Sequence, residues 1–240
     1  IIKYIKKLNK KPSVQRRLLE HFIAQGASTI PEMSKGIGVS LPTATHALNE
    51  LIKGGLVKEI GKKDNSPGRI PMVYDLMPNA GYFVGVNPEM DCLAFAASDF
   101  CGNLITKKIK VPYVYRNTPE NLERLGEIIN EFIAGLPISK EEILQVCVNV
   151  AERVNPFEGK AYNMFTFLEN PLAEKLTELI QLPVCIENDT RSMAFAEFIK
   201  GCCKGMKDVI FVNMCWGLGI GIIIDGKLYY GKSGYSGEFG

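Results

Sequence analysis

The sequence predicts an α/β protein in two parts: a small helical domain over residues 1–78, and a larger domain over residues 79–240 in which strands and helices alternate. Three observations lead to this prediction. Apolar residues of the first part recur at helical spacing behind good N-cap residues. The second part alternates short apolar runs with amphipathic stretches. The turn-forming run 78–81 separates the two.

Composition bounds the classes of function. The chain has 240 residues, is 46% hydrophobic and carries a net charge of +2, so any nucleic-acid contact must come from a local basic patch. Seven cysteines without a C-x-x-C pair indicate reduced thiols and a cytoplasmic location. No apolar run reaches the roughly 18 residues of a membrane span, so we expect no membrane partner. Because the chain stops inside a glycine-rich motif, we expect a piece of a longer polypeptide, truncated at the C-terminus.

Three helices are predicted in the first part. Ser13 is a good N-cap for a helix that ends at Gly26 and has an apolar face of Val14, Leu18, Leu19, Phe22 and Ile23. A short helix follows over residues 29–35, and a glycine-containing turn leads to the third helix at 41–53. Its predicted apolar face consists of Leu41, Ala44, Leu48, Leu51 and Ile52.

The second and third helices have the pattern of a helix-turn-helix, because the third helix is polar on its outer side. The candidate DNA-binding side chains at its cap and on that side are Ser40, Thr43, Thr45, His46, Asn49 and Lys53. A β-hairpin is then predicted, with strands at 56–60 and 72–76 and a basic loop between them. Lys62, Lys63 and Arg69 of this loop could reach phosphates or a narrow minor groove, as in a wing. The alternative is a small helical cap with a solvated hairpin.

The second part begins with three predicted strands, at 82–86, 93–98 and 104–111. Thr118 is expected to cap a long helix that runs to about residue 134. A buried strand at 143–150, a helix at 171–180 and a strand at 184–186 follow. A further helix, capped by Asp189 or Thr190, is expected to end at Gly201. The apolar runs 209–214 and 220–224 predict two more strands, and Asp225-Gly226 predicts a two-residue hairpin turn.

Polar residues at the end of the strand at 184–186 indicate a ligand site. Asn188 can donate and accept hydrogen bonds, and Asp189 is a candidate general base for a hydroxyl group. The glycine-dense series Gly217, Gly219 and Gly221 lets backbone amides approach an anion closely, which makes these residues candidate nucleotide contacts. The spacing excludes the G-x-G-x-x-G motif of dinucleotide-binding proteins. The plain alternative is that Asp189 only caps a helix and the glycines only form hairpins.

Together these motifs resemble the ROK family of sugar kinases and sugar-responsive repressors. The resemblance rests on Glu187-Asn188-Asp189 before an alanine-containing helix, and on the ordered glycine series from Gly217 through Asp225-Gly226 to Gly237-Glu238-Phe239-Gly240. The run Ser66-Pro-Gly-Arg-Ile-Pro71 also resembles the S-x-G-R-x-P signature of ROK repressors. The resemblance implies an actin/hexokinase-like (ribonuclease H-like) fold in which Asn188, Asp189 and Glu238 contact a sugar. In members that are kinases, Asp189 would be the base.

Two segments depart from the family pattern. ROK kinases carry D-x-G-G-T after the first strand to hold ATP phosphates, and the matching residues here are Asn87-Pro88-Glu89-Met90. Proline lacks a backbone donor and glutamate repels phosphate. The second departure is Asn149-Val-Ala-Glu152, where the family has a proline-glycine turn. The structural zinc that the resemblance implies would lie beyond Gly240, so no metal or other cofactor is assigned within the chain.

These observations predict a sugar-responsive transcriptional regulator, a repressor of carbohydrate metabolism, with no catalytic residue in use. Its expected partners are operator DNA, a sugar or sugar phosphate effector, and further copies of itself in a homodimer or higher oligomer. One alternative is an active ROK sugar kinase with an added DNA-binding segment. Another is a regulator that has lost its effector and responds to a protein partner.

Overall fold

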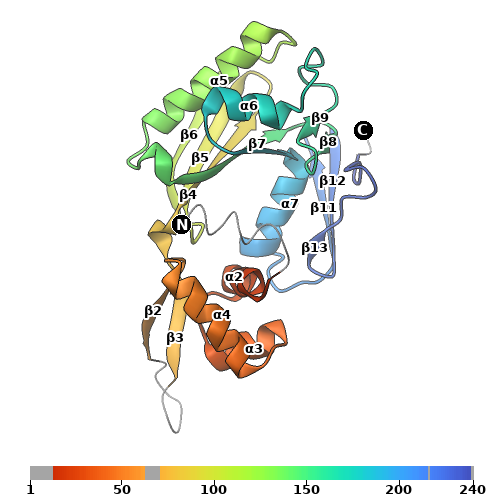
Figure 1. Ribbon diagram of the computed structural model, residues 1–240. Coiled ribbons are helices and arrows are strands. Elements are labelled where there is room, and N and C mark those ends of the chain that lie inside the picture. Colours follow the sequence, from red (N-terminus) through yellow and green to blue (C-terminus); the bar gives the residue numbers. More distant parts are fainter. Residues whose placement is uncertain (1–12, 63–70, 216, 239–240) are drawn as a thin grey trace. The chain divides into compact units, whose positions relative to one another are not determined.

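The computed structural model describes residues 13–62, 71–215 and 217–238, and it contains two compact units (Figure 1). The N-terminal unit comprises the described residues up to Tyr82 together with Ser98–Asn103. The C-terminal unit comprises Phe83–Ala97 and the described residues from Leu104 onward.

The N-terminal unit consists of three helices and a small antiparallel sheet. The helices are α2 (Val14–Gln25), α3 (Ile30–Ile37) and α4 (Leu41–Lys53). The strands β1 (Ser28–Thr29), β2 (Val57–Lys62) and β3 (Met72–Leu76) pair in the order β1-β3-β2, and a short 3-10 helix, η1, covers Pro78–Ala80. β1 pairs with β3 and so completes the sheet. The sequence analysis did not predict β1, because a strand of two residues is too short to show an alternating pattern.

Local sequence signals set the ends of these helices. The Ser13 side chain accepts a hydrogen bond from the Arg16 amide and so caps α2, and Gly26 ends it at φ 78°. Ser40 caps α4 in the same way, through the Thr43 amide. Gly38, at φ 62°, forms the left-handed turn that separates α3 from α4. A left-handed residue favours glycine because it has no Cβ to clash with the backbone.

A single hydrophobic cluster holds the N-terminal unit together. Its fully buried members include Leu18, Met33, Leu48, Leu51 and Leu56. The predicted helix faces need one correction, since Ile23, Leu41 and Ile52 are exposed whereas Ala47 is buried. The buried stripe of α4 is therefore narrower than its apolar pattern suggested, and the residues at its edges reach solvent.

The C-terminal unit is built on a five-stranded sheet with strand order β10-β7-β4-β5-β6. The strands are β4 (Tyr82–Pro88), β5 (Cys92–Asp99), β6 (Leu104–Pro112), β7 (Ile143–Val150) and β10 (Val184–Asn188). Helices α5 (Pro119–Ala134) and α6 (Leu172–Ile180) cover one face of this sheet (Figure 1). Thr118 caps α5 as predicted, by accepting a hydrogen bond from the Asn121 amide. A short 3-10 helix, η2 (Lys140–Glu142), precedes β7.

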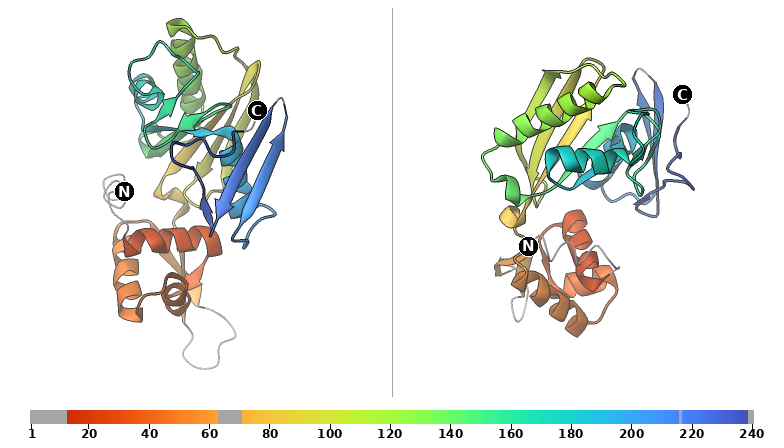
Figure 2. Two further views of the ribbon diagram at one scale, coloured as in Figure 1. Left: turned by 90° about the vertical axis from the view of Figure 1, so that its right-hand side faces the viewer. Right: turned by 45° about the horizontal axis from the view of Figure 1, so that its top comes forward.

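Helix α7 (Asp189–Lys200) follows β10 directly and packs against a second sheet, formed by β11 (Val209–Met214), β12 (Leu218–Ile224) and β13 (Lys227–Leu228) (Figure 2). The predicted hairpin turn at Asp225-Gly226 is confirmed, with φ of 50° and 73°. The strand predicted from Ile220 begins at Leu218 instead, so Gly219 lies inside β12. A short hairpin of β8 (Val154–Asn155) and β9 (Lys160–Ala161) was not predicted.

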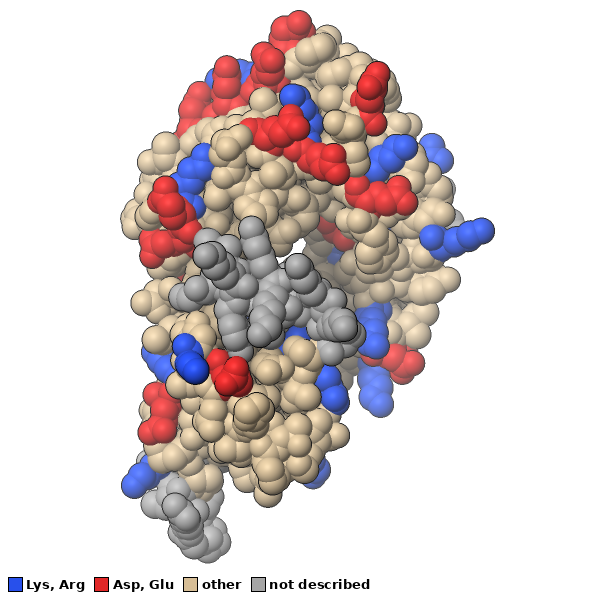
Figure 3. Space-filling model, in the orientation of Figure 1, with Lys and Arg blue, Asp and Glu red and all other residues tan. Residues whose placement is uncertain are grey.

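Charge is unevenly distributed over the surface of the C-terminal unit. Acidic side chains gather over α5 at the top of Figure 3, where Glu120, Glu123, Glu127 and Glu131 are exposed. Arg124 lies among them and contacts Glu127 and Glu131 at 2.9 and 3.0 Å. This face would repel DNA phosphates. Within the described part of the chain, none of the helices has the length and apolar character needed to cross a membrane.

Candidate functional site

The candidate effector site lies where two parallel strands end. β10 pairs in parallel with β7, and this register places Asn188 beside Val150 at the carboxyl end of the sheet. Asn188, not Asp189 or Thr190 as predicted, is the N-cap of α7, because its Oδ1 accepts the Arg191 amide hydrogen at 3.0 Å. Its Nδ2 donates to the Glu152 carbonyl oxygen at 3.2 Å and to Glu238 Oε1 at 3.4 Å.

Asp189 is half-buried in the first turn of α7. Its Oδ1 accepts hydrogen bonds from the Thr190 amide at 2.6 Å and from the Thr190 hydroxyl at 3.2 Å. Thr190 itself is buried, and its Oγ1 also accepts a hydrogen bond from Asn213 of β11 at 3.2 Å. A carboxylate in the first turn of a helix is favoured by the helix dipole, and Asp189 occupies such a position in α7.

Glu238 reaches Asn188 from the far end of the chain. A bridge between Gly219 and Glu238 and a hydrogen bond from the Ile220 amide to the Gly237 carbonyl oxygen at 3.0 Å fix its position against β12. Gly237 adopts φ 88°, and a Cβ there would collide with the carbonyl oxygen of Ile220. The structure therefore brings Asn188, Asp189 and Glu238 to one place; whether they bind a sugar stays a prediction.

The environment of Glu238 raises the pKa of its carboxyl group. Desolvation raises the pKa of this carboxyl above its ordinary value, and the negative charge of Asp189 raises it further. Arg191 and Arg153 act in the opposite direction without cancelling the shift. Burial also raises the pKa of Glu152, whose carboxylate accepts hydrogen bonds from the Asn163 and Met164 amides at 2.6 and 2.8 Å.

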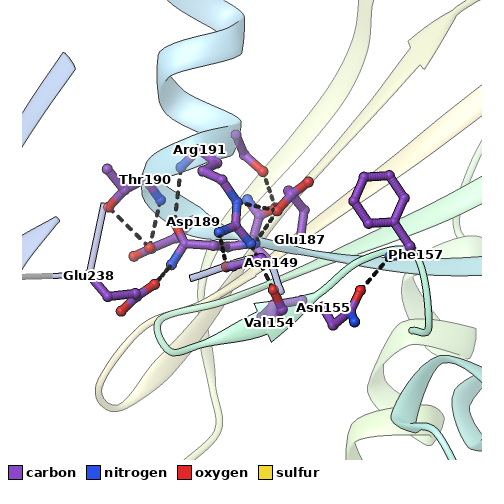
Figure 4. A network of polar contacts seen from close by, with 12 residues as sticks. Asn149, Val154, Asn155, Phe157, Glu187, Asp189, Thr190, Arg191 and Glu238 are labelled. Atoms are coloured by element: carbon purple, nitrogen blue, oxygen red, sulfur yellow. Dashed lines mark hydrogen bonds and ion pairs between the residues drawn. The ribbon is translucent and has the colours of Figure 1, made fainter. Parts of the chain in front are cut away.

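Arg191 is a site residue that the sequence analysis missed. Only 1% of it is exposed, yet it makes three hydrogen bonds: to Glu187 Oε1 at 2.8 Å from Nε, to the Gly234 carbonyl oxygen at 2.6 Å from Nη1, and to the Val154 carbonyl oxygen at 3.1 Å from Nη2. Figure 4 shows the guanidinium group between Glu187 and the β8 strand. An arginine two residues after the strand-end Asn188-Asp189 pair was the signal available in the sequence, but no pattern indicated that it would be buried.

The glycine series has a packing role. A Cβ at Gly219 would collide with Thr190 Oγ1, and a Cβ at Gly221 would collide with Ala194 of α7. These two glycines let β12 lie directly against α7. At Gly217, by contrast, a Cβ would meet no atom within 4 Å. Nucleotide contacts at Gly217, Gly219 and Gly221 stay a prediction.

The end of β4 and the turn to β5 contain residues 87–90, which were predicted to replace the phosphate loop of the kinases. Asn87 at the end of β4 accepts a hydrogen bond from Asn149 of β7 at 3.2 Å, and Asn149 in turn accepts one from Ser192 of α7 at 2.8 Å. The Glu89 amide donates to the Cys92 carbonyl oxygen at 2.8 Å. These polar groups bind one another, and Pro88 has no amide hydrogen to offer a phosphate.

The predicted DNA-binding side chains of α4 divide into two groups. Ser40, Thr43, His46, Asn49 and Lys53 are at least partly exposed. Thr45 is half-buried, and its hydroxyl donates to the Leu41 carbonyl oxygen at 2.8 Å, so it is less available than the others. Lys62 is exposed at the end of β2. Lys63, Arg69 and most of the Ser66–Pro71 signature lie outside the described residues, as do Trp216, Phe239 and Gly240.

Among the described residues, no group of three or more histidine, cysteine, aspartate or glutamate side chains is placed to hold a metal ion. The structural zinc that the family resemblance makes possible is not tested.

Known proteins are similar to this chain in sequence and in fold. A xylose repressor of Bacillus subtilis is 28% identical over 239 residues, which are 99% of this chain and 60% of the repressor. A glucokinase of Streptomyces coelicolor is 33% identical over 162 residues, which are 67% of this chain and 49% of the kinase. The chain thus spans less than two thirds of the length of these relatives.

A solved structure described as a ROK family transcriptional regulator, homolog of the Escherichia coli MLC protein, superposes with a TM-score of 0.74. The superposition covers 95% of this chain and 58% of the chain of the regulator, and the two sequences are 23% identical. This similarity shows that the two chains share a fold. Residues 92–240, more than half of the sequence, match the model of the ROK family. The α/β architecture, the ordered motifs and this match agree, and the chain therefore belongs to the ROK family.

Proposed function

We propose that this chain belongs to a sugar-responsive transcriptional repressor. The observation that carries the proposal is the extent of its similarities. The xylose repressor aligns with 99% of the chain, so that the N-terminal unit is included, whereas the glucokinase aligns with only 67%. The repressor relative therefore aligns with the N-terminal unit, whereas the kinase relative leaves about a third of the chain unaligned.

The N-terminal unit supports DNA binding through its shape and its exposed side chains. We interpret α3, the turn at Gly38 and α4 as a helix-turn-helix, with α4 as the helix that enters the major groove. Asn49 is exposed on it and can contact base edges. We interpret the β2–β3 hairpin as the wing, with Lys62 near its tip able to contact a phosphate.

The C-terminal unit supports sugar binding through the convergence of Asn188, Asp189 and Glu238. Carboxylates accept hydrogen bonds from sugar hydroxyls, and the asparagine amide can both donate and accept. A sugar or sugar phosphate that binds two arrangements of a homodimer unequally would change the affinity for operator DNA. The same argument makes the regulation reciprocal, since operator DNA would then weaken sugar binding.

Absence of kinase activity is supported by the β4–β5 turn. Phosphoryl transfer depends on positioning the phosphates and neutralising them with a metal ion. Here Asn87 and Asn149 bind each other, the Glu89 amide is used by Cys92, and Glu89 adds negative charge. The alternative function, an active sugar kinase, is favoured by the similarity to the glucokinase and by Asp189 at the position of a base.

The test uses the full-length protein. Fluorescence anisotropy with labelled fragments of its own upstream region should detect specific binding, and D-xylose, D-glucose or glucose 6-phosphate should change that affinity. Calorimetry with magnesium-ATP should give no binding, and a coupled assay should give no sugar-dependent ATP turnover. Sugar-dependent turnover would establish the kinase alternative instead, and lack of any specific DNA complex would refute the proposed regulator.

A further inference from the structure

Arg191 joins three separate segments of the C-terminal unit. It lies in the first turn of α7, and its guanidinium group donates to the side chain of Glu187 in β10, to the backbone of Val154 in β8 and to the backbone of Gly234. Of these segments, the one around Gly234 leads directly to Glu238. Figure 4 shows the Glu187 and Val154 contacts converging on one buried guanidinium group.

We infer that Arg191 is the positioning residue of the effector site, because it holds residues 229–238 and β8 against the start of α7 and so lets Glu238 meet Asn188. This inference rests on the proposed function in one respect, that the site binds a sugar. Arg191 is not itself a ligand contact, since only 1% of it is exposed and each of its three nitrogens already donates to Glu187 or to a backbone carbonyl oxygen.

The contacts require an arginine. The donors of a guanidinium group form a rigid planar fork that can reach three acceptors in different directions, whereas a lysine ammonium is a single point on a flexible stem. A buried charge is also costly unless it is paired and hydrogen-bonded. Glu187 supplies the pairing at 2.8 Å and is itself only 15% exposed, so the two charges neutralise each other inside the protein.

Aromatic packing also holds residues 229–238 against Arg191. The Arg191 guanidinium group lies 5.4 Å from the ring centre of Tyr230, which belongs to the held segment. Phe157 packs on Tyr230 edge to face, with the ring centres 5.0 Å apart. Arg191 therefore contacts the segment at two points, the Tyr230 ring and the Gly234 carbonyl group.

Gly234 provides an independent sign that the segment and β8 must lie close together. It adopts φ 77°, and a Cβ at this position would collide with the carbonyl oxygen of Val154. The two carbonyl groups that Arg191 binds thus belong to backbones in direct contact. A side chain at residue 234 would push them apart and separate the two acceptors.

Arg191 also acts on Glu238 through its charge. The groups that influence the pKa of Glu238 are Asp189, which raises it, and Arg191 and Arg153, which lower it. Asn188 donates to the same carboxylate at 3.4 Å. Arg191 therefore favours the ionised, acceptor form of Glu238 while it holds the segment in place.

The experiment compares R191K with R124K in the full-length protein. Both change an arginine of the C-terminal unit to lysine, but Arg124 is exposed on α5 and contacts Glu127 and Glu131 on the surface. Amide hydrogen exchange without sugar, the affinity for D-xylose and D-glucose, and the affinity for operator DNA without sugar are measured for each. A further variant, G234A, disturbs the same contact while the Arg191 side chain stays unchanged.

For R191K and G234A we expect faster exchange in residues 229–238 and unchanged exchange in β4 and β5. Sugar affinity should fall by roughly tenfold to a hundredfold, the range expected when hydrogen bonds to a charged group are lost. DNA affinity without sugar should stay at the wild-type value, which a general loss of stability would not allow. R124K should match the wild type in all three measurements.

Unchanged exchange in residues 229–238 of both R191K and G234A would overturn the inference, whatever the sugar result. Faster exchange together with wild-type sugar affinity would overturn the link between the held segment and the effector site. If the wild type binds no sugar while R191K exchanges faster in this segment, the proposed sugar function fails and the positioning role of Arg191 stands.

Discussion

Gly219 lies in β12, where its lack of a side chain decides how closely α7 can pack. A Cβ there would collide with the Thr190 hydroxyl, and Thr190 is buried beneath it. Thr190 in turn donates to Asp189 and accepts from Asn213. The absence of a side chain at residue 219 thus allows β12 to pack against Thr190, which hydrogen-bonds to Asp189 of the candidate effector site.

Replacement of Gly219 by alanine should destabilise the protein by about 1–3 kcal/mol, the usual cost of overpacking a tight contact. The matched control is Gly217→Ala, because nothing lies within 4 Å of a Cβ at that position. The measurement is urea unfolding followed by circular dichroism. Equal midpoints for the two variants would contradict the packing role assigned to Gly219.

The raised pKa of Glu238 predicts how sugar binding depends on pH. The ionised carboxylate accepts hydrogen bonds from the sugar, so affinity should fall as the pH is lowered through the pKa of this group. Because desolvation and Asp189 raise that pKa, the fall should begin at a higher pH than for an ordinary glutamate.

Calorimetric titration with the sugar from mildly acidic to neutral pH tests this, with Glu238→Gln as the variant and the exposed Glu158→Gln as the control. The glutamine variant should bind more weakly at neutral pH and lose the dependence that Glu238 causes. A wild-type pH profile in that variant would assign the dependence to another group.

At the scale of elements, α4 combines two opposite faces in one helix. Ala44, Ala47, Leu48 and Leu51 are buried in the N-terminal unit, and Thr43, Asn49 and Lys53 are exposed. The helix is fixed at its start by Ser40 and followed by Gly54-Gly55. α4 therefore presents polar side chains to solvent, and the major groove of B-DNA is wide enough to admit an α-helix.

Replacement of Asn49 by alanine should relax the base preference at one operator position and cost about 1–3 kcal/mol in binding. Replacement of the exposed Lys53 or Lys62 by glutamine should weaken binding to all sequences and lower the salt slope by about 1. Anisotropy titrations over a range of salt concentrations measure both effects. Gln25→Ala on α2 is the control, and an Asn49 variant with wild-type preference would mean that α4 is not the reading helix.

At the scale of the whole molecule, the division into units does not follow the chain. The tip between β5 and β6, residues 98–103, belongs to the N-terminal unit although its strands belong to the other. The Phe100 amide donates to the Pro78 carbonyl oxygen at 3.0 Å, and Phe100 and Cys101 pack against the N-terminal core. The domain boundary expected after residue 78 stays a prediction, and it does not assign residues 98–103 to the N-terminal unit.

Replacement of Phe100 by alanine should therefore destabilise the N-terminal unit, by about 1–3 kcal/mol because the ring is only half-buried. Amide hydrogen exchange should become faster in α2 and α4 and stay unchanged in α5 and α6. Ile109→Ala is the control, since Ile109 is 62% exposed on β6. Equal effects on both units would contradict the assignment of residues 98–103.

The sequence alone determined the elements whose signals are local. They include the helix caps Ser13 and Thr118, the turn at Asp225-Gly226, and α5 with its apolar residues at helical spacing. These features depend only on residues close together in the chain, so they could be predicted. The motif Glu187-Asn188-Asp189 and the following glycine series were enough to indicate the family.

The tertiary structure decided whatever depends on residues far apart in the chain. The approach of Glu238 to Asn188 spans 50 residues, and the contact of Arg191 with Gly234 spans 43. No local pattern distinguishes an arginine that will be buried among carbonyl groups from one that will face solvent. The glycines at 219 and 221 likewise gained their packing role only when β12 came against α7, because steric room is a property of the folded arrangement.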